Sequence, residues 1–312
     1  SRYILGNLEG RTLVPVSDND LTELDRWIYG RLNAAVKANR EALENYRYND
    51  AASSLMEYFW NEFCDWYVEA TKLSFWHGDE SEKNRAVSVL LNVLEESLRL
   101  LHPFIPFVTE EIYGKLPLSE IVANRTKSGE CHIISNSKYS SMLINAPFPE
   151  VVPERSDDTV FLRFDTLKDL IGKVRALRTE CGIDPASKIN IAIIVTKGSG
   201  AEVCHEKQDM IKLLAGCANI SFADSKPESS VGTVGKGFEA FVIVDDSINK
   251  EQLLSRFKKE IASESEWIKK SEAKLNGNFS KHAPAELVAL EKEKMEESKR
   301  KIQKLESYIE SL

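Results

Sequence analysis

Apolar residues recur every three or four positions through the first third of the chain, which is the spacing of one face of an α-helix. This pattern predicts a bundle of three long amphipathic helices within residues 1–117. Their apolar faces are Leu21, Leu24, Ile28, Leu32 and Ala35 in the first, Leu55, Phe59, Phe63, Trp66, Ala70 and Leu73 in the second, and Val87, Leu90, Leu94, Leu98 and Leu101 in the third. Asp18-Asn19-Asp20 is typical of an N-cap for the first helix, with Glu23 completing a capping box. We expect the second helix to begin after Asn49-Asp50.

Two prolines interrupt the apolar pattern in the stretch HPFIPF, residues 102–107. Pro103 cannot donate a backbone hydrogen bond and disfavours helical geometry at His102, so it should end the third helix. Pro106 suits the first turn of the next helix, where an N–H group has no helical partner to lose. The stretch therefore predicts a tight corner between two packed helices. The side chains expected to fill the joint are Phe104, Ile105 and Phe107.

The periodicity changes to that of strands in the middle of the chain. We expect strands at 189–195, 218–224 and 239–246, and helices at 159–181 and 202–216. These elements predict a small α/β domain over residues 159–249. The segment 118–158, rich in Ser, Asn and Pro, is predicted to be a connector with a short strand at 141–145. The glycine-rich stretch VGTVGKGFEA, residues 231–240, lacks the context of a phosphate-binding loop and is predicted to join two strands.

Heptad repeats end the sequence. Apolar residues at heptad spacing are Leu254, Phe257, Ile261, Ile268 and Leu275 before the break NGNFSKHAP, and Val288, Met295, Ile302, Leu305, Ile309 and Leu312 after it. Two such seams predict an antiparallel coiled-coil hairpin over residues 250–312. The remaining seam positions toward the tip are Glu264, Ser271, Glu291 and Ser298. Packing should therefore be tightest at the base of the hairpin.

The composition is that of an ordinary globular protein, with 42% apolar and 29% charged residues among 312. No apolar run approaches the roughly 20 residues that span a bilayer, and no basic-then-apolar leader is present. We therefore expect a cytoplasmic protein without a membrane partner. The chain begins at Ser1 in mid-pattern and without methionine, so we interpret it as a piece of a longer protein. Its net charge is −8, yet residues 250–312 carry +2, so a polyanionic partner would meet local basic patches.

Candidate chemistry is sparse. The five cysteines form no C-x-x-C pair, which indicates buried thiols in a reducing compartment and no structural zinc site. Phosphate-binding, zinc-protease and serine-hydrolase motifs are absent from the sequence. Glu110 and Glu111 are neighbours on a predicted helix, and they suit its positive end better than they suit acid/base catalysis. The sequence therefore predicts binding surfaces, with no catalytic residue and no cofactor.

Three segments resemble the anticodon-binding helix bundle of class I aminoacyl-tRNA synthetases, and within that class the valyl-tRNA synthetase family. They are DRWIYGRLN (25–33), DAASSLMEYFWNEFCDWYVEATK (50–72) and LLHPFIPFVTEEIYGKLP (100–117). The C-terminal part of the same family is resembled by FDTLKDLIGKVRALRTECGIDPASK (164–188), LLSRFKKEI (253–261) and NGNFSKHAPAELVALEKEK (276–294). Isoleucyl and leucyl enzymes share the HPFIPF corner, so the equivalent region of one of them is an alternative, although neither ends in this hairpin.

The resemblance implies a partner and a division of tasks. The family's catalytic signatures H-I-G-H and K-M-S-K-S are missing from this sequence. ATP and Mg²⁺ are therefore expected in a catalytic domain outside it, and this chain alone should be inactive. The implied partners are tRNA(Val) and the protein's own catalytic and editing domains, in a monomer. The bundle would bind the anticodon arm of the tRNA and the hairpin would bind the elbow.

Lysine, arginine and aromatic side chains are those that bind RNA phosphates and splayed bases. Candidates for the anticodon arm are Arg26, Arg31, Lys37, Arg40, Arg47 and Trp60, with Trp27 and Tyr67 as further rings, and candidates for the elbow are Lys269, Lys270, Lys274, Phe279 and Lys281. Each has a plainer alternative as packing or solvated surface; Phe279, for example, could fold back on Leu275. Arg175 and Arg178 could touch RNA or pair with an acid such as Asp169 or Glu180.

A function of another class is also compatible with this sequence. The hairpin could be a protein-interaction scaffold that grips a partner helix. Salt discriminates the two hypotheses, because binding dominated by phosphates weakens steeply with ionic strength and an apolar coiled-coil contact does not.

Overall fold

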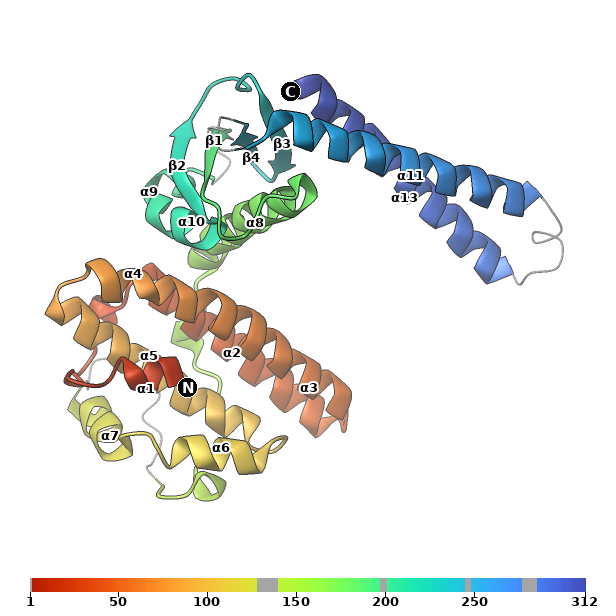
Figure 1. Cartoon of the computed structure of the whole chain (residues 1–312). Coiled ribbons are helices and arrows are strands. Elements are labelled where there is room, and N and C mark those ends of the chain that lie inside the picture. The colour runs from red at the N-terminus through yellow and green to blue at the C-terminus, as the bar shows by residue number, and fades with distance from the viewer. Residues whose placement is uncertain (1, 128–139, 197–200, 245–247, 277–284) are drawn as a thin grey trace. The chain divides into compact units, whose positions relative to one another are not determined.

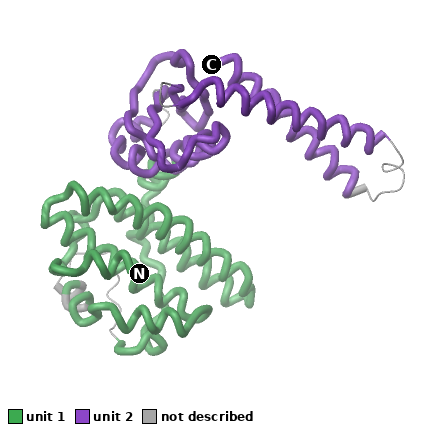
Figure 2. The backbone as a smooth tube through the Cα atoms, in the orientation of Figure 1, with its two compact units in different colours: residues 1–165 green, residues 166–312 purple. Residues whose placement is uncertain are grey.

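The computed structural model describes residues 2–127, 140–196, 201–244, 248–276 and 285–312. They form two compact units, residues 1–165 and 166–312, coloured separately in Figure 2. Unit 1 is helical, and unit 2 joins a small mixed sheet to a helical hairpin (Figure 1). The fold is therefore mainly α with a small α/β part, as the sequence predicts. The finer division into four segments stays a prediction.

Unit 1 contains the three predicted long helices. Its elements are α1 (Arg2–Gly6), η1 (Asp18–Asp20), α2 (Glu23–Glu44), α3 (Tyr48–Met56), η2 (Glu57–Val68), α4 (Glu69–His77), α5 (Glu80–Leu101), α6 (Pro106–Tyr113), α7 (Leu118–Lys127), η3 (Leu143–Asn145) and η4 (Pro153–Arg155). The second predicted helix is the continuous run α3–η2–α4, whose middle part η2 is π-helical. The predicted strand at 141–145 is wrong, because η3 is a 3₁₀ turn.

The N-terminus of α2 is capped at Thr22, two residues later than the predicted cap Asp20. Thr22 and Asp25 form the capping box, in which Thr22 Oγ1 accepts the Asp25 N–H at 3.2 Å and Asp25 Oδ2 accepts the Thr22 N–H at 2.9 Å. The predicted cap Asp18–Asp20 is instead the 3₁₀ turn η1, with a capping box of its own at Ser17. Both stretches have the capping pattern, and only the position of the first helical hydrogen bonds distinguishes them.

Helix α5 is the centre of the bundle, although its sequence predicts an amphipathic helix. Every residue from Ala86 to Leu101 is buried. The polar residues within this run have partners inside the bundle: Glu95 pairs with Arg99, Glu96 with Arg155, and Ser97 hydrogen-bonds with Tyr58. Burying a charged group costs free energy unless it is paired and hydrogen-bonded, so these partners allow a helix with buried charges to fill the core.

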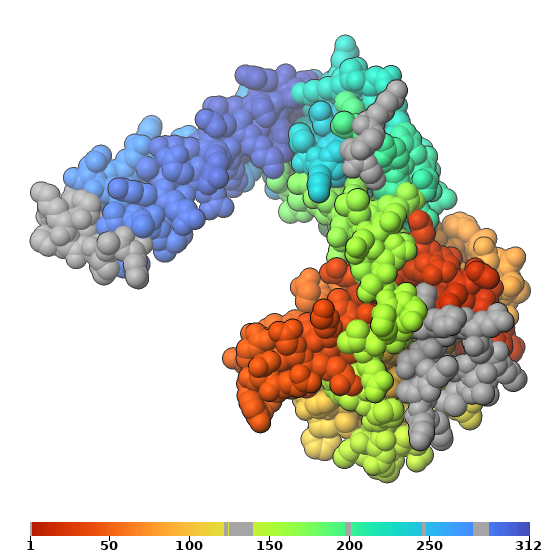
Figure 3. Space-filling view, turned by 180° about the vertical axis from the view of Figure 1, so that it is seen from behind, coloured from red at the N-terminus to blue at the C-terminus, as the bar shows by residue number. Residues whose placement is uncertain are grey.

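A segment of the predicted connector, residues 147–155, crosses α2 and α5 and is called the strap. Its carbonyl groups accept hydrogen bonds from Arg99 (to Pro147, 3.0 Å) and Arg40 (to Pro149, 2.8 Å), and the Val152 N–H donates to Asn33 at 2.7 Å. At its end Arg155 donates two hydrogen bonds, of 2.7 and 2.8 Å, to Glu96. Figure 3 shows this light-green segment running along the bundle.

The HPFIPF corner joins α5 to α6 as predicted, with Pro106 at the first helical position. Two details of the prediction are wrong. His102 keeps helical dihedral angles, and Ile105, which precedes the second proline, is the residue that leaves them. Ile105 and Phe107 also do not fill the joint, because Phe107 is 91% exposed and Ile105 45% exposed. The side chains of α6 that are buried are Thr109 and Tyr113, further along the helix.

Unit 2 contains the three predicted strands and a fourth. Its elements are α8 (Asp158–Cys181), which begins in unit 1, then β1 (Ile189–Val195), α9 (Val203–Glu206), α10 (Gln208–Ala215), β2 (Cys217–Phe222), β3 (Ser230–Gly235), β4 (Phe238–Ile243), α11 (Lys250–Asn276) and α13 (Ala285–Ser311). The sheet order is β2-β1-β4-β3. β1 pairs in parallel with β2, and the other pairs are antiparallel.

The glycine-rich stretch was predicted to be a loop between two strands. Its first part is the strand β3, and only the turn between β3 and β4 is a loop. A Cβ atom at Gly232 would lie 2.5 Å from the Phe241 ring, and one at Gly235 would lie 2.0 Å from the Phe238 ring. Both rings belong to β4, which pairs with β3. The glycines therefore allow the rings of the neighbouring strand to lie across β3. Gly237 has a φ of 82° and supplies the left-handed turn.

The predicted hairpin is present as α11 and α13, which pack along each other (Figure 1). Near its base Phe257, Leu305 and Tyr308 are buried. Toward the tip the seam is polar, and Ser271 donates a 2.9 Å hydrogen bond to Glu291. The structure thus confirms the prediction that apolar packing is tightest at the base.

Candidate nucleic-acid interface

The run α3–η2–α4 folds back along α2, so the bundle candidates lie on two antiparallel arms. Near one end the Tyr67 hydroxyl donates to Asp25 at 2.7 Å. Near the other end Asn39 donates to the carbonyl of Ala51 at 3.1 Å. The turn at residues 45–47 is therefore the end of this helical pair. In Figure 3 that end, coloured orange-red, projects from unit 1.

Three residues at this turn, Tyr46, Arg47 and Tyr48, form what we call the aromatic tip. Tyr46 is 79% and Tyr48 57% exposed, and their ring centroids lie 6.5 Å apart in an edge-to-face arrangement. Between them, Arg47 is exposed and forms ion pairs with Glu41 (3.4 Å) and Asp50 (3.2 Å). Exposed ion pairs of this kind contribute little free energy, so the guanidinium can exchange these partners for a phosphate or a base.

The aromatic tip has the chemistry of a single-strand RNA contact. Tyrosine rings and guanidinium planes are surfaces on which unpaired bases stack. Tyr46 also has a φ of 55°, a left-handed conformation that is unusual for a bulky residue and that occurs preferentially at functional sites. Residue type selects Arg47 in the sequence and does not select either tyrosine. The signal that could have drawn attention to them is the alternation Tyr-Arg-Tyr just before the predicted start of the second helix.

Three other arginine candidates of the bundle are engaged inside it. Arg26 donates to the carbonyl of Asp18, Arg31 pairs with the buried Glu62, and Arg40 donates to the strap at Pro149. Each is only partly exposed. Their assignment to RNA stays a prediction, and the structure gives each of them a role within unit 1.

Among the remaining bundle candidates, Lys37 and Trp60 face solvent and Trp27 and Tyr67 do not. Trp60 is 60% exposed, and Lys37 forms no ion pair with any residue that the structure describes. Trp27 is buried and stacks on Phe164 at 5.5 Å. Tyr67 is buried as well, and burial together with the Asp25 carboxylate raises its pKa. Stacking of a base on Trp27 or Tyr67 would require the core to open.

The candidate residues on the hairpin differ in their exposure and in their ion pairs. Lys269 and Lys270 are exposed on α11, where Lys270 pairs with Glu266 at 2.7 Å, and Lys274 pairs across the seam with Glu291 at 3.0 Å. Lys269 has no ion pair within the described part of the chain. Phe279 and Lys281 lie outside the described residues. The exposed pair Lys269 and Lys270, on α11 toward the tip of the hairpin, is therefore the part of this candidate set that could contact a phosphate.

The base of the hairpin is attached to the sheet domain through the last turn of α8. Glu180 accepts hydrogen bonds from Lys304 (2.8 Å) and from the hydroxyl of Tyr308 (3.0 Å). Burial and the neighbouring Glu180 carboxylate raise the pKa of Tyr308. Arg256 of α11 donates to the carbonyl of Thr179 at 3.2 Å. These contacts hold the base of the hairpin against the end of α8 within unit 2.

Arg175 and Arg178 on α8 both donate hydrogen bonds to backbone carbonyl groups of unit 2. Arg178 donates to the carbonyls of Asp184, Pro185 and Ser187 in the loop after α8, and to that of Ala215 after α10. Arg175 donates to the carbonyl of Leu214 at 2.7 Å. Both arginines therefore hold α8 against the segment that leads into β2.

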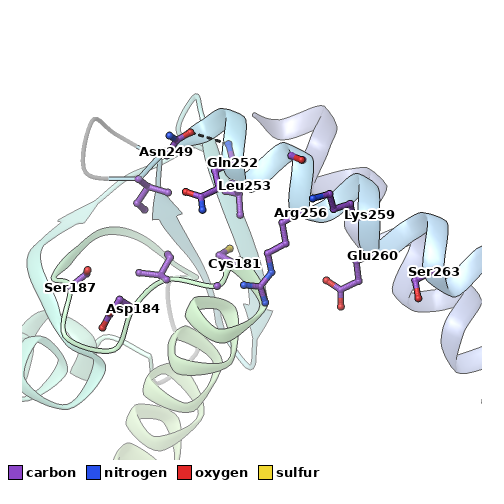
Figure 4. Close-up of a pocket in the computed structure, with 14 residues that line it drawn as sticks. Cys181, Asp184, Ser187, Asn249, Gln252, Leu253, Arg256, Lys259, Glu260 and Ser263 are labelled. Carbon is purple, nitrogen blue, oxygen red and sulfur yellow. Dashed lines mark hydrogen bonds between the residues drawn. The ribbon is translucent and has the colours of Figure 1, made fainter.

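A groove of about 710 Å³ lies beside the hairpin base, between the end of α8, the following loop and α11 (Figure 4). Its charged lining residues are Asp184, Arg256, Lys259 and Glu260. Two positive and two negative side chains give no net attraction for an anion. Burial raises the pKa of Cys181 in this groove to about 12, so its thiol stays protonated and is not an activated nucleophile.

The described residues contain no group of three His, Cys, Asp or Glu side chains placed to hold a metal ion. In the same ranges, no helix has the length and apolar character that crossing a membrane requires. Cys64, Cys181, Cys204 and Cys217 are free thiols. His205, adjacent to Cys204, stacks on Phe222 with ring centroids 3.7 Å apart. The exposed surfaces, and in particular the aromatic tip, thus carry the candidate chemistry of this chain.

A helical bundle with an exposed Tyr-Arg-Tyr tip, joined to a small sheet and a lysine-bearing hairpin, defines a binding module of the RNA-associated class. Residues 25–193 match the family described as the anticodon-binding domain of tRNA ligase. This match covers more than half of the chain, so the chain belongs to that family.

Relatives similar over the whole chain are valine–tRNA ligases. That of Treponema denticola is 50% identical over 100% of this chain and 34% of its own length. That of Treponema pallidum is 38% identical over 99% of this chain and 33% of its own length. That of Thermotoga maritima is 34% identical over 100% of this chain and 33% of its own length. The chain therefore spans about a third of the length of the curated relatives it matches.

Proposed function

We propose that this chain is the tRNA-binding portion of a valine–tRNA ligase and that it binds tRNA(Val). The observation that carries the proposal is the similarity of the whole of this chain to about a third of each valine–tRNA ligase, together with the anticodon-binding family match over the segment that contains the aromatic tip. The aromatic tip, with Lys37 and Trp60, binds the anticodon loop of the tRNA. The hairpin lysines bind the phosphate backbone at the elbow of the tRNA.

The contribution of these surfaces to aminoacylation is positional. Binding energy from remote parts of a substrate can be used to place its reacting end in a distant active site. In this proposal ATP and Mg²⁺ act in a catalytic part outside this sequence, which lacks the H-I-G-H and K-M-S-K-S signatures. The chain binds and orients the tRNA and makes no bond itself, as part of a cytoplasmic monomer. The four free cysteines are compatible with a reducing compartment.

The test is a titration of the chain with tRNA(Val) and with a non-cognate tRNA at 50 and 200 mM salt. We expect tighter binding of tRNA(Val), and for two to four phosphate contacts an affinity about 10- to 150-fold lower at the higher salt. Equal affinity for the two tRNAs would contradict the proposal that this chain recognises the anticodon loop of tRNA(Val). Affinity that is independent of salt, or a stable complex with a helical protein partner instead, would favour the scaffold hypothesis.

The elbow contact is tested by the double variant Lys269→Glu with Lys270→Glu. Its affinity for tRNA(Val) should fall about tenfold or more, with a shallower dependence on salt, because two phosphate partners become repulsive. The matched control is Lys299→Glu with Arg300→Glu, which makes the same change in charge on α13, where both residues already interact with Glu296. An equal loss in the two variants would show that only net charge matters.

A further inference from the structure

Five large apolar side chains are exposed in two hydrogen-bonded segments, the start of α6 and the residues around η3, and we call them the α6 apolar patch. They are Ile105, Phe107, Val108, Met142 and Ile144. Phe107 is 91% and Ile144 67% exposed. Three of the five, Phe107, Met142 and Ile144, line a shallow hollow of about 410 Å³ with His102, Pro106, Glu110 and Glu111. Single exposed apolar residues are ordinary, but a contiguous group of them marks an interaction surface.

The two segments that carry the patch are held together by hydrogen bonds. Glu110 of α6 accepts the N–H of Leu143 at 2.9 Å, and the hydroxyl of Tyr113 donates to the carbonyl of Ser140 at 3.2 Å. Thr109 ties the start of α6 to the corner through a 2.9 Å hydrogen bond with His102. The patch is therefore a preformed surface, and a partner need not order it on binding.

The side chains that line the hollow favour binding of a protein partner over binding of RNA. Among the residues that the structure describes, its lining holds two carboxylates, Glu110 and Glu111, and no lysine or arginine. The nearby Lys115 pairs with Glu111 at 2.7 Å. Phosphates would be repelled here, whereas an apolar side chain with a basic or hydroxyl neighbour would satisfy both the rings and the acidic rim.

The patch is too small for a stable contact with a free partner. A standard interface between separate proteins involves about 20–30 residues on each side, whereas the described residues of the α6 apolar patch and of the lining of its hollow are nine together. A segment of the same polypeptide needs much less area, because the tether gives it an effective concentration of about millimolar. The relatives are about three times longer than this chain, so such a segment exists in proteins of this kind.

We propose that the α6 apolar patch docks on the part of the same polypeptide that lies outside residues 1–312, with an apolar side chain of that part in the hollow beside Phe107. This contact sets the direction of the helical bundle with respect to the part that carries out the chemistry. The inference rests on the chain being a portion of a longer valine–tRNA ligase, as proposed above, and it does not depend on which surface binds tRNA.

The test compares amide hydrogen exchange of α6 in residues 1–312 alone and in the natural full-length polypeptide. Exchange of α6 should be at least tenfold slower in the full-length protein. The variant Phe107→Asp with Ile144→Asp should abolish this difference and lower aminoacylation by the full-length protein about tenfold. In residues 1–312 alone the same variant should keep its melting temperature within about 2 °C and its affinity for tRNA, because both positions are exposed. Val234→Asp, at an exposed position of β3, is the control.

Three outcomes would overturn the proposal. Equal exchange of α6 in the two wild-type proteins would show that nothing outside residues 1–312 covers the patch. A large loss of melting temperature in the variant of residues 1–312 alone would show that this chain covers its own patch. A wild-type chain that dimerises, with dimerisation lost in the variant, would assign the patch to a second copy. Failure of residues 1–312 to bind tRNA would instead count against the proposed function and leave the exchange result valid.

Discussion

Replacing Arg155 by alanine is expected to lower the free energy of unfolding of unit 1 by about 3–5 kcal/mol, the usual loss when one partner of a buried ion pair is removed. The Arg155 guanidinium and the Glu96 carboxylate share two hydrogen bonds, of 2.7 and 2.8 Å, and both residues are almost wholly buried. The guanidinium also lies 4.9 Å from the centre of the Tyr29 ring. Without Arg155 the Glu96 carboxylate loses two charge-assisted hydrogen bonds in the core.

Urea denaturation followed by tryptophan fluorescence measures this loss, because four of the five tryptophans belong to unit 1. Combining Arg155→Met with Glu96→Met should recover most of the stability, since two apolar groups can replace a buried pair of similar volume. Lys115→Ala, which breaks an exposed pair with Glu111, is the control and should leave the unfolding midpoint unchanged. A small effect of Arg155→Ala would mean that water reaches Glu96 and that the strap is not held by this contact.

Replacing both tyrosines of the aromatic tip, as Tyr46→Asn with Tyr48→Ala, should lower the affinity for tRNA(Val) about 5- to 150-fold for each base that stacks there. Asparagine tolerates the left-handed φ of 55° at position 46 better than tyrosine does, so the fold should not suffer. No charge changes, so the dependence of affinity on salt should keep its slope while the whole curve moves to weaker binding.

The measurement is a binding titration with an RNA stem–loop that presents an open anticodon loop, and with a fully paired hairpin of the same length. Only the open loop offers unstacked bases, so only its affinity should fall. Trp76→Ala, at an equally exposed aromatic residue of α4, is the matched control. Parallel losses for the open loop and the paired hairpin would show that the tyrosines support the fold or contact the backbone, and stacking would be excluded.

Local features of the fold could be predicted from the sequence with good accuracy. The three bundle helices, the strands at β1, β2 and β4, and both arms of the hairpin lie within a few residues of their predicted bounds. The heptad pattern placed Ser271 and Glu291 at seam positions toward the tip of the hairpin, and the structure joins the two by a hydrogen bond. These features depend on neighbours along the chain, through helical or strand periodicity, and such neighbours are visible in a sequence.

The predictions that failed concern features that depend on tertiary packing and not on the local residue pattern. The period of 3.6 residues predicted an inward face that includes Phe59 and Trp66, but the π-helical winding of η2 turns Tyr58, Glu62 and Tyr67 into the core. Glycine-rich β3 was predicted as a loop because its partner rings, which need the missing Cβ atoms, are on another strand.

The residues of the candidate site likewise could not be identified from residue type alone. Residue type selected Arg47, whose assignment to RNA stays a prediction, and it also selected Arg26, Arg31 and Arg40, whose side chains reach acceptors inside the bundle. A long arginine side chain looks the same in the sequence whether its partner is an RNA phosphate or a carbonyl group of a distant segment. The exposure of Tyr46 and Tyr48 could likewise not be inferred from residue type alone.

By itself, the sequence determined the kinds of element, their order, the proline corner, the heptad seam and the family resemblance, because each is encoded by residues close together in the chain. The tertiary structure alone decided that α5 is buried from Ala86 to Leu101 with paired charges, that Arg155 joins the strap to the core, and that Phe107 faces solvent. The physical reason is that burial and pairing depend on which remote segment packs against a side chain, and no local pattern records that choice.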